Sequence, residues 1–288
     1  MTEGSHQPVM VEEVVRMLGD AEVVVDMTLG AGGHAAALLR AGVRQVVGVD
    51  RDASALELAR AQLGDLAERV RFVRARFSEV DEDVVGTEAD GVLFDLGVSS
   101  MQLDDAERGF SFRRDARLDM RMAGEADDEP SARDLVNELP EGELADLLYR
   151  YGDERRSRRI AAAIVRNRPI ETTDQLTGII VSAVGRRPGG PHPARRSFQA
   201  LRIAVNRELE ELTASLPHAA GLLAPGGRVV AISYHSFEDG IVKRGFRDDP
   251  NLQVLTRKPL TASDVERAAN PRARSAKLRA AEKQRAAA

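Results

Sequence analysis

The 288-residue sequence contains no cysteine, which excludes disulfide bonds, thiolate metal ligands and a cysteine nucleophile. Residues 1–10 lack the apolar segment of a secretory signal, and no stretch reaches the ~18 apolar residues that a membrane span needs. The five histidines are not spaced as metal ligands, and no internal repeat is visible. We therefore expect a cytoplasmic protein without a membrane segment or a metal site.

The acidic and basic residues are unevenly distributed along the chain. Residues 1–154 hold 16 Lys and Arg against 34 Asp and Glu, a net charge of −18, whereas residues 155–288 hold 25 against 12, a net of +13. Such asymmetry is typical of proteins with a polyanionic partner. The alternative is that two oppositely charged regions simply face solvent or one another.

Apolar runs at 23–25, 46–49, 70–73 and 91–94 alternate with helical patterns such as residues 53–64. Near-continuous apolar strands separated by helices predict a parallel sheet covered on both faces. Because 43% of the residues are apolar, the chain can build such a core.

The alternation stops after Asp95, and only helical patterns follow until a strand returns at 228–233. One of them is a single long helix from Arg195 to Leu216, with apolar residues at spacings of three and four. The pattern predicts an α/β domain formed by residues 1–105 and 216–288, with a helical insertion at 106–215. The last ~25 residues are basic and alanine-rich, and we expect them to be ordered only in part or only on RNA.

A glycine-rich segment, Gly30 to His34, follows the first strand, and Asp50 ends the second strand 18 residues beyond Gly32. Glycines let the backbone approach a ligand, the next helix offers unpaired N–H groups, and a carboxylate at Asp50 suits two ribose hydroxyls. These features predict a nucleoside-cofactor pocket. The turn also matches the looser G-x-G-x-x-A pattern of NAD-binding proteins.

Asp95 ends the fourth strand and is followed by small polar residues up to Gln102. A carboxylate at this rim could orient an amine acceptor or hold the cofactor. Alternatively, Asp95 only caps the following segment.

At this point the sequence resembles one family closely, the bacterial MraW/RsmH-type rRNA N4-cytosine methyltransferases. The resemblance rests on blocks in the same order along nearly the whole chain: DMTLGAGGH (26–34), GVDRD (48–52), DLGVSSMQLDDAERGFSF (95–112), LDMRM (118–122), HPARRSFQALRIAVNRELEEL (192–212), ISYHSFEDGIVKR (232–244) and NPRARSAKLR (270–279).

The resemblance implies an α/β fold, a Rossmann-like class I methyltransferase sheet with an inserted all-helical subdomain. It also implies S-adenosyl-L-methionine as cofactor and a cytosine in the decoding region of small-subunit (16S) rRNA as substrate, within the assembled subunit. By position, the implied cofactor contacts are Gly32, Gly33, His34, Asp50, Phe77, Asp95 and Gln102. Phe77 could lie against the adenine or simply pack in the core. The chain departs from the family at Met101, usually proline, and at Tyr234, often phenylalanine. A homodimer is compatible with the sequence.

Two further segments predict contacts with the acceptor. Arg195 and Arg196 begin a helix, where arginine is poorly placed for the helix dipole, so a phosphate ligand or a local ion pair is expected. Catalysis is assigned to Asp95 and His235, and RNA binding to Arg195, Arg196, Tyr234 and Ser236, with Tyr234 stacking on a flipped cytosine. Asp119 is a weaker candidate. Phosphate contacts are also expected from the arginines at 155–159 and from Arg272, Arg274, Lys277 and Arg279.

Three other functions compete with this interpretation. An NAD-dependent oxidoreductase would need a proton-donor group that the sequence does not show. A non-catalytic RNA-binding assembly factor would not need Gly32, Asp50 and Asp95. A methyltransferase acting on protein or a small molecule is compatible with the fold alone.

Overall fold

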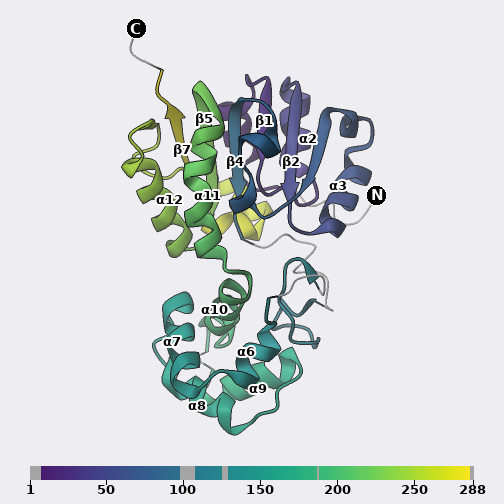
Figure 1. Cartoon of the computed structure of the whole chain (residues 1–288). Helices are drawn as coiled ribbons and strands as arrows, with labels where there is room; N and C mark the ends of the chain where they lie inside the picture. The colour runs from purple at the N-terminus through teal and green to yellow at the C-terminus, as the bar shows by residue number, and fades with distance from the viewer. Residues whose placement is uncertain (1–7, 98–107, 125–128, 187, 286–288) are drawn as a thin grey trace. The chain divides into compact units, whose positions relative to one another are not determined.

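The computed structural model describes residues 8–97, 108–124, 129–186 and 188–285. The chain divides into two compact units (Figure 1): a sheet unit of Met1–Gly97 and Leu209–Ala288, and a helical unit of Val98–Glu208. The unit boundaries lie eight and seven residues before those expected from the sequence. In the described residues, no helix is both long and apolar enough to cross a membrane.

The sheet unit contains seven strands in the order β3-β2-β1-β4-β5-β7-β6. The strands from β3 to β5 in that order are parallel, whereas β7 is antiparallel to both of its neighbours. This arrangement confirms the predicted α/β, Rossmann-like sheet. The strand bounds are β1 (Val23–Asp26), β2 (Gln45–Asp50), β3 (Val70–Arg74), β4 (Ala89–Asp95), β5 (Leu223–Ser233), β6 (Leu252–Val254) and β7 (Lys277–Lys283).

Successive strand residues feed two separate cores, because side chains alternate between the faces of a sheet. Val24 and Val46 pack in one core and Val25 and Val47 in the other. The first core is covered by helices α1 (Val11–Leu18), α2 (Gly33–Ala41) and α3 (Ala53–Leu63). The second is covered by α4 (Glu82–Val85), α11 (Glu208–Leu222) and α12 (Ser236–Asp248). Shorter elements are η1 (Gly64–Arg69), η2 (Phe77–Glu79), α13 (Asp264–Ala269) and η5 (Pro271–Ser275).

The helical unit has its own apolar core, which includes Leu144, Leu148, Ile160, Leu176 and Leu201. Its helices follow the predicted patterns, and the Thr172 side chain caps α9 by accepting the Gln175 N–H. The bounds are α6 (Ala132–Glu138), α7 (Glu141–Gly152), α8 (Ser157–Arg166), α9 (Thr173–Val184) and α10 (Arg195–Asn206).

The prediction of one long helix from Arg195 to Leu216 is wrong. Arg207 has a left-handed backbone with φ of 50° and ends α10, and α11 begins at Glu208. Arg202 of α10 forms a bidentate ion pair with Glu208 at 2.7 Å. Because this pair spans the break, it offsets part of the cost of a non-glycine residue in that conformation.

The expectation of a partly ordered basic C-terminal tail is also wrong. Residues 277–283 form β7, an interior strand of the sheet, and Leu278, Ala280 and Ala281 are fully buried. Small alanines let the strand fit between its neighbours. Arg279 is only 6% exposed and donates to Asp239 at 2.7 Å, so it is engaged within the fold and is not a phosphate contact.

The position of β7 makes stability depend on a residue in the segment expected to be disordered. Leu278→Ala should lower the free energy of unfolding by about 2–5 kcal/mol, because it leaves a cavity in the first core. Urea denaturation followed by circular dichroism measures this change. The matched control is Leu255→Ala, at a side chain 39% exposed, where a change within about 0.5 kcal/mol is expected. Equal stability of the two variants would contradict the placement of β7.

Candidate functional site

Three carboxylates end three neighbouring strands of the sheet unit. Asp26, Asp50 and Asp95 are the last residues of β1, β2 and β4, and β1 lies between the other two strands. Because these strands are parallel, their carboxyl ends lie at one edge, where open α/β sheets bind their ligands.

The turn after β1 depends on glycine. Gly32 has φ of 80° and precedes the first residue of α2, and a Cβ there would lie 3.2 Å from the Leu63 Cδ1. A Cβ on Gly33 would lie 2.9 Å from Pro8 Cγ. The backbone therefore turns sharply into α2, which begins without a side-chain cap. An uncapped helix start suits an anionic group of a ligand.

Asp50 is held by backbone donors from both sides of the turn. The Gly30 N–H donates to Oδ2 and the Asp52 N–H to Oδ1, each at 2.9 Å. Burial raises the pKa of Asp50, although these two hydrogen bonds act against the rise. Each carboxylate oxygen keeps acceptor capacity for a further donor. This fixed acceptor fits the ribose-binding role predicted for Asp50.

Asp26 is the most deeply buried of the three acids, with 1% of its surface exposed. Burial raises its pKa to about 6, while His34 and the Thr28 N–H act against the rise. The neighbouring charges of Asp95 and Asp50 raise the pKa further. Ionised Asp26 is therefore costly in the protein alone.

Asp95 is held by three contacts. Its backbone N–H donates to Thr28 Oγ1 at 2.6 Å, and its Oδ1 accepts the Tyr234 hydroxyl at 2.7 Å. Its Oδ2 lies 3.4 Å from His34 Nε2. Burial and the charge of Asp95 raise the pKa of Tyr234, so the hydroxyl stays protonated and acts as the donor. The backbone contact and the two carboxylate contacts together hold Asp95 in one orientation.

His34 lies in the first turn of α2 and is 5% exposed. Burial alone would lower its pKa, but the contact with Asp95 and the charges of Asp95 and Asp26 outweigh burial and raise it. His34 therefore offsets part of the negative charge of the edge when it is protonated.

Phe77 starts η2 and meets Phe94 edge-on, with ring centroids 6.0 Å apart. Phe94 is fully buried, whereas Phe77 is only partly buried. One side of the Phe77 ring thus contributes to the second core and the remainder is accessible to a ligand. Both sequence interpretations of Phe77 are compatible with this position.

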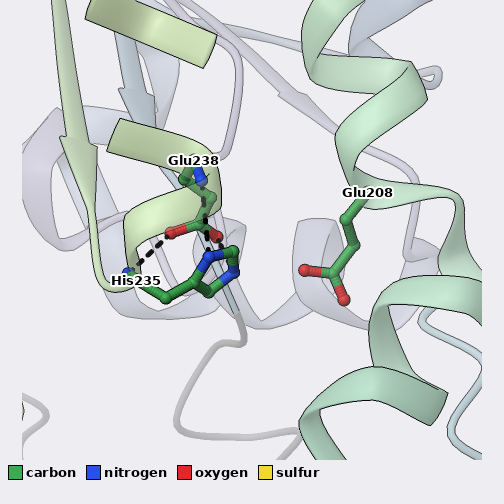
Figure 2. A group of neighbouring side chains, drawn as sticks. All are labelled: Glu208, His235 and Glu238. Carbon is green, nitrogen blue, oxygen red and sulfur yellow. Dashed lines mark hydrogen bonds and ion pairs between the residues drawn. The ribbon is translucent and has the colours of Figure 1, made fainter. Parts of the chain in front are cut away.

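His235 has a local structural role. Its Nδ1 accepts the Glu238 N–H at 3.4 Å, and Glu238 Oε2 accepts the His235 backbone N–H (Figure 2). Glu238 Oε2 also accepts the Tyr234 backbone N–H. This reciprocal capping box fixes the start of α12 at Ser236. His235 Nε2 lies 3.0 Å from Glu238 Oε1. Glu208, also drawn in Figure 2, belongs to the helical unit, where it pairs with Arg202.

The candidates of the helical unit differ in their contacts. Arg195 and Arg196 are both exposed at the start of α10. Arg196 donates to the Asp153 carbonyl at 2.8 Å, which is the local pairing considered from the sequence. The Arg195 side chain has no hydrogen bond or ion pair with a described residue. Asp119 forms a bidentate ion pair with Arg121 at 2.8 and 2.9 Å, which lowers its pKa against the effect of burial.

Gln102 lies outside the described residues, as does Met101 before it. Sequence reasoning missed the contribution of Asp26. The signal was present, because Asp26 ends its strand as Asp50 and Asp95 end theirs. The hydrogen bond between Tyr234 and Asp95 joins residues 139 positions apart and has no local sequence signal.

The charge of this edge discriminates between cofactors. Asp50 and Asp95 lie close enough to Asp26 for their charges to raise its pKa, so the edge favours a ligand with positive charge. S-adenosylmethionine carries a sulfonium and an ammonium against one carboxylate, whereas the pyrophosphate of NAD would add negative charge. The negative charge of these carboxylates therefore favours binding of S-adenosylmethionine and disfavours binding of NAD.

The burial of Asp26 predicts a pH-dependent stability difference. The pKa of Asp26 is 3.8 in the unfolded chain and about 6 in the folded protein. The free energy of unfolding therefore falls as the pH rises from 4 through 6, because Asp26 must then ionise in a buried position. The loss is about 3 kcal/mol for a shift of this size. Asp26→Asn keeps an acceptor for the Thr28 N–H and removes the charge. Relative to the original protein without cofactor, the variant should gain stability between pH 4 and 7.

Urea denaturation across that pH range measures the difference. Asp65→Asn, at an exposed acid of η1, is the control and should show a nearly constant offset. A constant offset for Asp26→Asn as well would contradict the assignment.

Comparison with known proteins shows the family to which the chain belongs. The model of the MraW methylase family matches residues 3–284. Three relatives carry the name ribosomal RNA small subunit methyltransferase H. The protein from Sorangium cellulosum is 49% identical, covering 96% of this chain and 90% of its own length. Those from a Nostoc and a Synechococcus strain are 48% and 50% identical, covering 97% and 96% of this chain and 93% and 91% of their own.

A family model that spans nearly the whole chain, with relatives of about half identity along their full lengths, matches the resemblance found in the sequence motifs. The chain belongs to the MraW methylase family.

Proposed function

We propose that this methyltransferase transfers the methyl group of S-adenosylmethionine to the exocyclic N4 amine of a cytosine in the decoding region of small-subunit (16S) rRNA. The observation that carries the proposal is the near-full-length similarity to proteins named ribosomal RNA small subunit methyltransferase H. The cation-favouring edge of the sheet unit supports the choice of cofactor.

The sheet unit is the cofactor-binding domain in this proposal, and the helical unit recognises the substrate. Asp50 accepts the ribose hydroxyls, and the uncapped start of α2, at Gly32, Gly33 and His34, receives the methionine carboxylate. Phe77 lies against the adenine. Gln102 completes the predicted contact set.

Asp95 is the group closest to the chemistry. The cofactor supplies a methyl group already activated by its sulfonium. The cytosine N4 lone pair is delocalised into the ring, so an acceptor for an N4–H bond helps to localise it. Asp95 provides that acceptor in a fixed orientation, since Tyr234 and Thr28 hold it. Positioning of this kind contributes more than strong base catalysis when the donor is activated.

The remaining assignments follow from exposure. Arg195, exposed and without a described partner, contacts the RNA backbone. Arg196 contributes less, because it is bonded to the end of α7. Tyr234 anchors Asp95 with its hydroxyl and presents its ring to the acceptor base. His235 and Ser236 shape the start of α12 beside that position. In this proposal the substrate is the RNA within the assembled small subunit, and no metal takes part. The reaction takes place in the cytoplasm, and the enzyme can act as a homodimer.

The test is methyl transfer from radiolabelled S-adenosylmethionine to small ribosomal subunits that lack the modification, followed by nucleoside analysis. We expect up to one labelled N4-methylcytidine per subunit and none in modified subunits. Label in another nucleoside or in a ribosomal protein would contradict the proposed substrate.

The same assay tests the cofactor contacts. Asp50→Asn should raise the KM for S-adenosylmethionine about 10- to 100-fold, since hydrogen bonds to a charged acceptor are lost. Asp65→Asn removes the same charge from an exposed position and should leave this KM unchanged. An unchanged KM in Asp50→Asn would contradict the proposal that Asp50 binds the ribose hydroxyls.

A further inference from the structure

Helix α8 of the helical unit carries a row of exposed arginines. Arg155 lies in the turn before the helix, Arg158 and Arg159 in its first turn, and Arg166 at its end. Since each helical residue turns by about 100°, Arg158, Arg159 and Arg166 project from one side of the helix, and Arg155 precedes them in the turn. The opposite side, with Ile160 and Ile164, is buried in the core of the unit.

The side chains of these arginines have no described partner, a property they share with Arg195. None of the four side chains forms a hydrogen bond or an ion pair with a described residue, and α8 contains no acidic residue. Elsewhere in the unit, arginines are neutralised locally, as in the pairs Arg121–Asp119, Arg133–Glu171 and Arg202–Glu208. Arg156, within the same run, donates to the Val184 carbonyl at 2.8 Å and helps to join α8 to α9.

The electrostatic repulsion among these arginines indicates that the row binds an anionic ligand. Arg155, Arg156, Arg158 and Arg159 lie within five residues that contain no acidic residue, so their like charges repel one another. Arg158 and Arg159 also lie near the positive end of the helix dipole. A polyanion lying along the row would reverse both effects, because each arginine would then face a phosphate.

The dimensions of the row suit a nucleic-acid backbone. From Arg158 to Arg166 the helix axis advances ~12 Å, and a DNA duplex presents one phosphate for each ~1.7 Å of its axis. Arg166 also borders a groove of about 630 Å³ between α8 and α9, whose mixed lining includes Asn167, Gln175 and Ser182 together with Asp174 and apolar residues. The amide and hydroxyl groups of this groove can form hydrogen bonds with ribose hydroxyls.

We propose that the arginine row of α8 (Arg155, Arg158, Arg159 and Arg166) is an RNA-backbone contact surface that holds the rRNA substrate. This deepens the proposed function, on which the identity of the RNA rests. The row contributes affinity through phosphates and carries no sequence readout. It adds a second basic contact to Arg195, at a separate helix of the same unit.

The experiment measures binding of a fluorescein-labelled single-stranded RNA oligonucleotide by anisotropy at several salt concentrations. The variant combines Arg155→Gln, Arg158→Gln and Arg159→Gln, which keep helix-forming side chains. The slope of log affinity against log salt should become shallower by about 2, since each lost phosphate contact removes about 0.7. Replacing the same three arginines by lysine should preserve the slope.

A matched control removes the same charge from the sheet unit, through Arg40→Gln, Arg257→Gln and Lys258→Gln, three exposed residues. Its slope should equal that of the original protein. An equal loss in both triple variants, or no loss in the α8 variant, would overturn the proposal. Retained S-adenosylmethionine affinity and circular dichroism show that the α8 variant is folded.

Binding to unmodified small subunits separates RNA from a protein partner. Weaker binding to subunits with unchanged binding to the oligonucleotide would place a ribosomal protein on α8 and overturn the proposal. In methyl transfer, the α8 variant should raise the KM for subunits and leave kcat unchanged. If the original protein methylates no subunit, the proposed function fails, while the salt slope still tests the RNA surface.

Discussion

The convergence of three carboxylates at neighbouring strand ends, with Asp26 buried among them, is the constraint on which the rest of the site depends. Asp26, Asp50 and Asp95 lie at one edge because β1, β2 and β4 are adjacent and parallel. The burial of Asp26 and its repulsion by the two neighbouring charges are unfavourable in the protein alone. Backbone donors, Tyr234 and His34 relieve only part of this cost. A cationic methyl donor such as S-adenosylmethionine would balance the remaining negative charge.

Much of the sheet unit could be predicted because its information is local. Apolar runs that end in aspartate mark β1, β2 and β4, and the glycines before α2 mark the turn that a ligand approaches. Strand adjacency then follows from the α/β pattern, so the site edge could be located from sequence. The contribution of Asp26 could also have been predicted from the sequence, because Asp26, Asp50 and Asp95 are each the last residue of a strand.

The features that could not be predicted depend on contacts or backbone conformations that leave no recognisable local sequence pattern. The composition of the basic segment 277–283 predicts a disordered tail. The segment is instead an interior strand, because Leu278 and its small neighbours pack beside β5. The break at Arg207 is set by backbone conformation and by the pair Arg202–Glu208, not by glycine or proline. Likewise, the hydrogen bond from Tyr234 to Asp95 exists only once β4 and β5 are paired.

The central claim is that the cofactor's positive charge is balanced by Asp26 and its neighbours. Titration calorimetry of S-adenosylmethionine binding at pH 6, in two buffers of different ionisation enthalpy, measures protons released on binding. A bound cation favours ionised Asp26 and neutral His34, so both groups release protons, and the account predicts net release that shrinks in Asp26→Asn. Binding without proton release, or with uptake, would contradict the account.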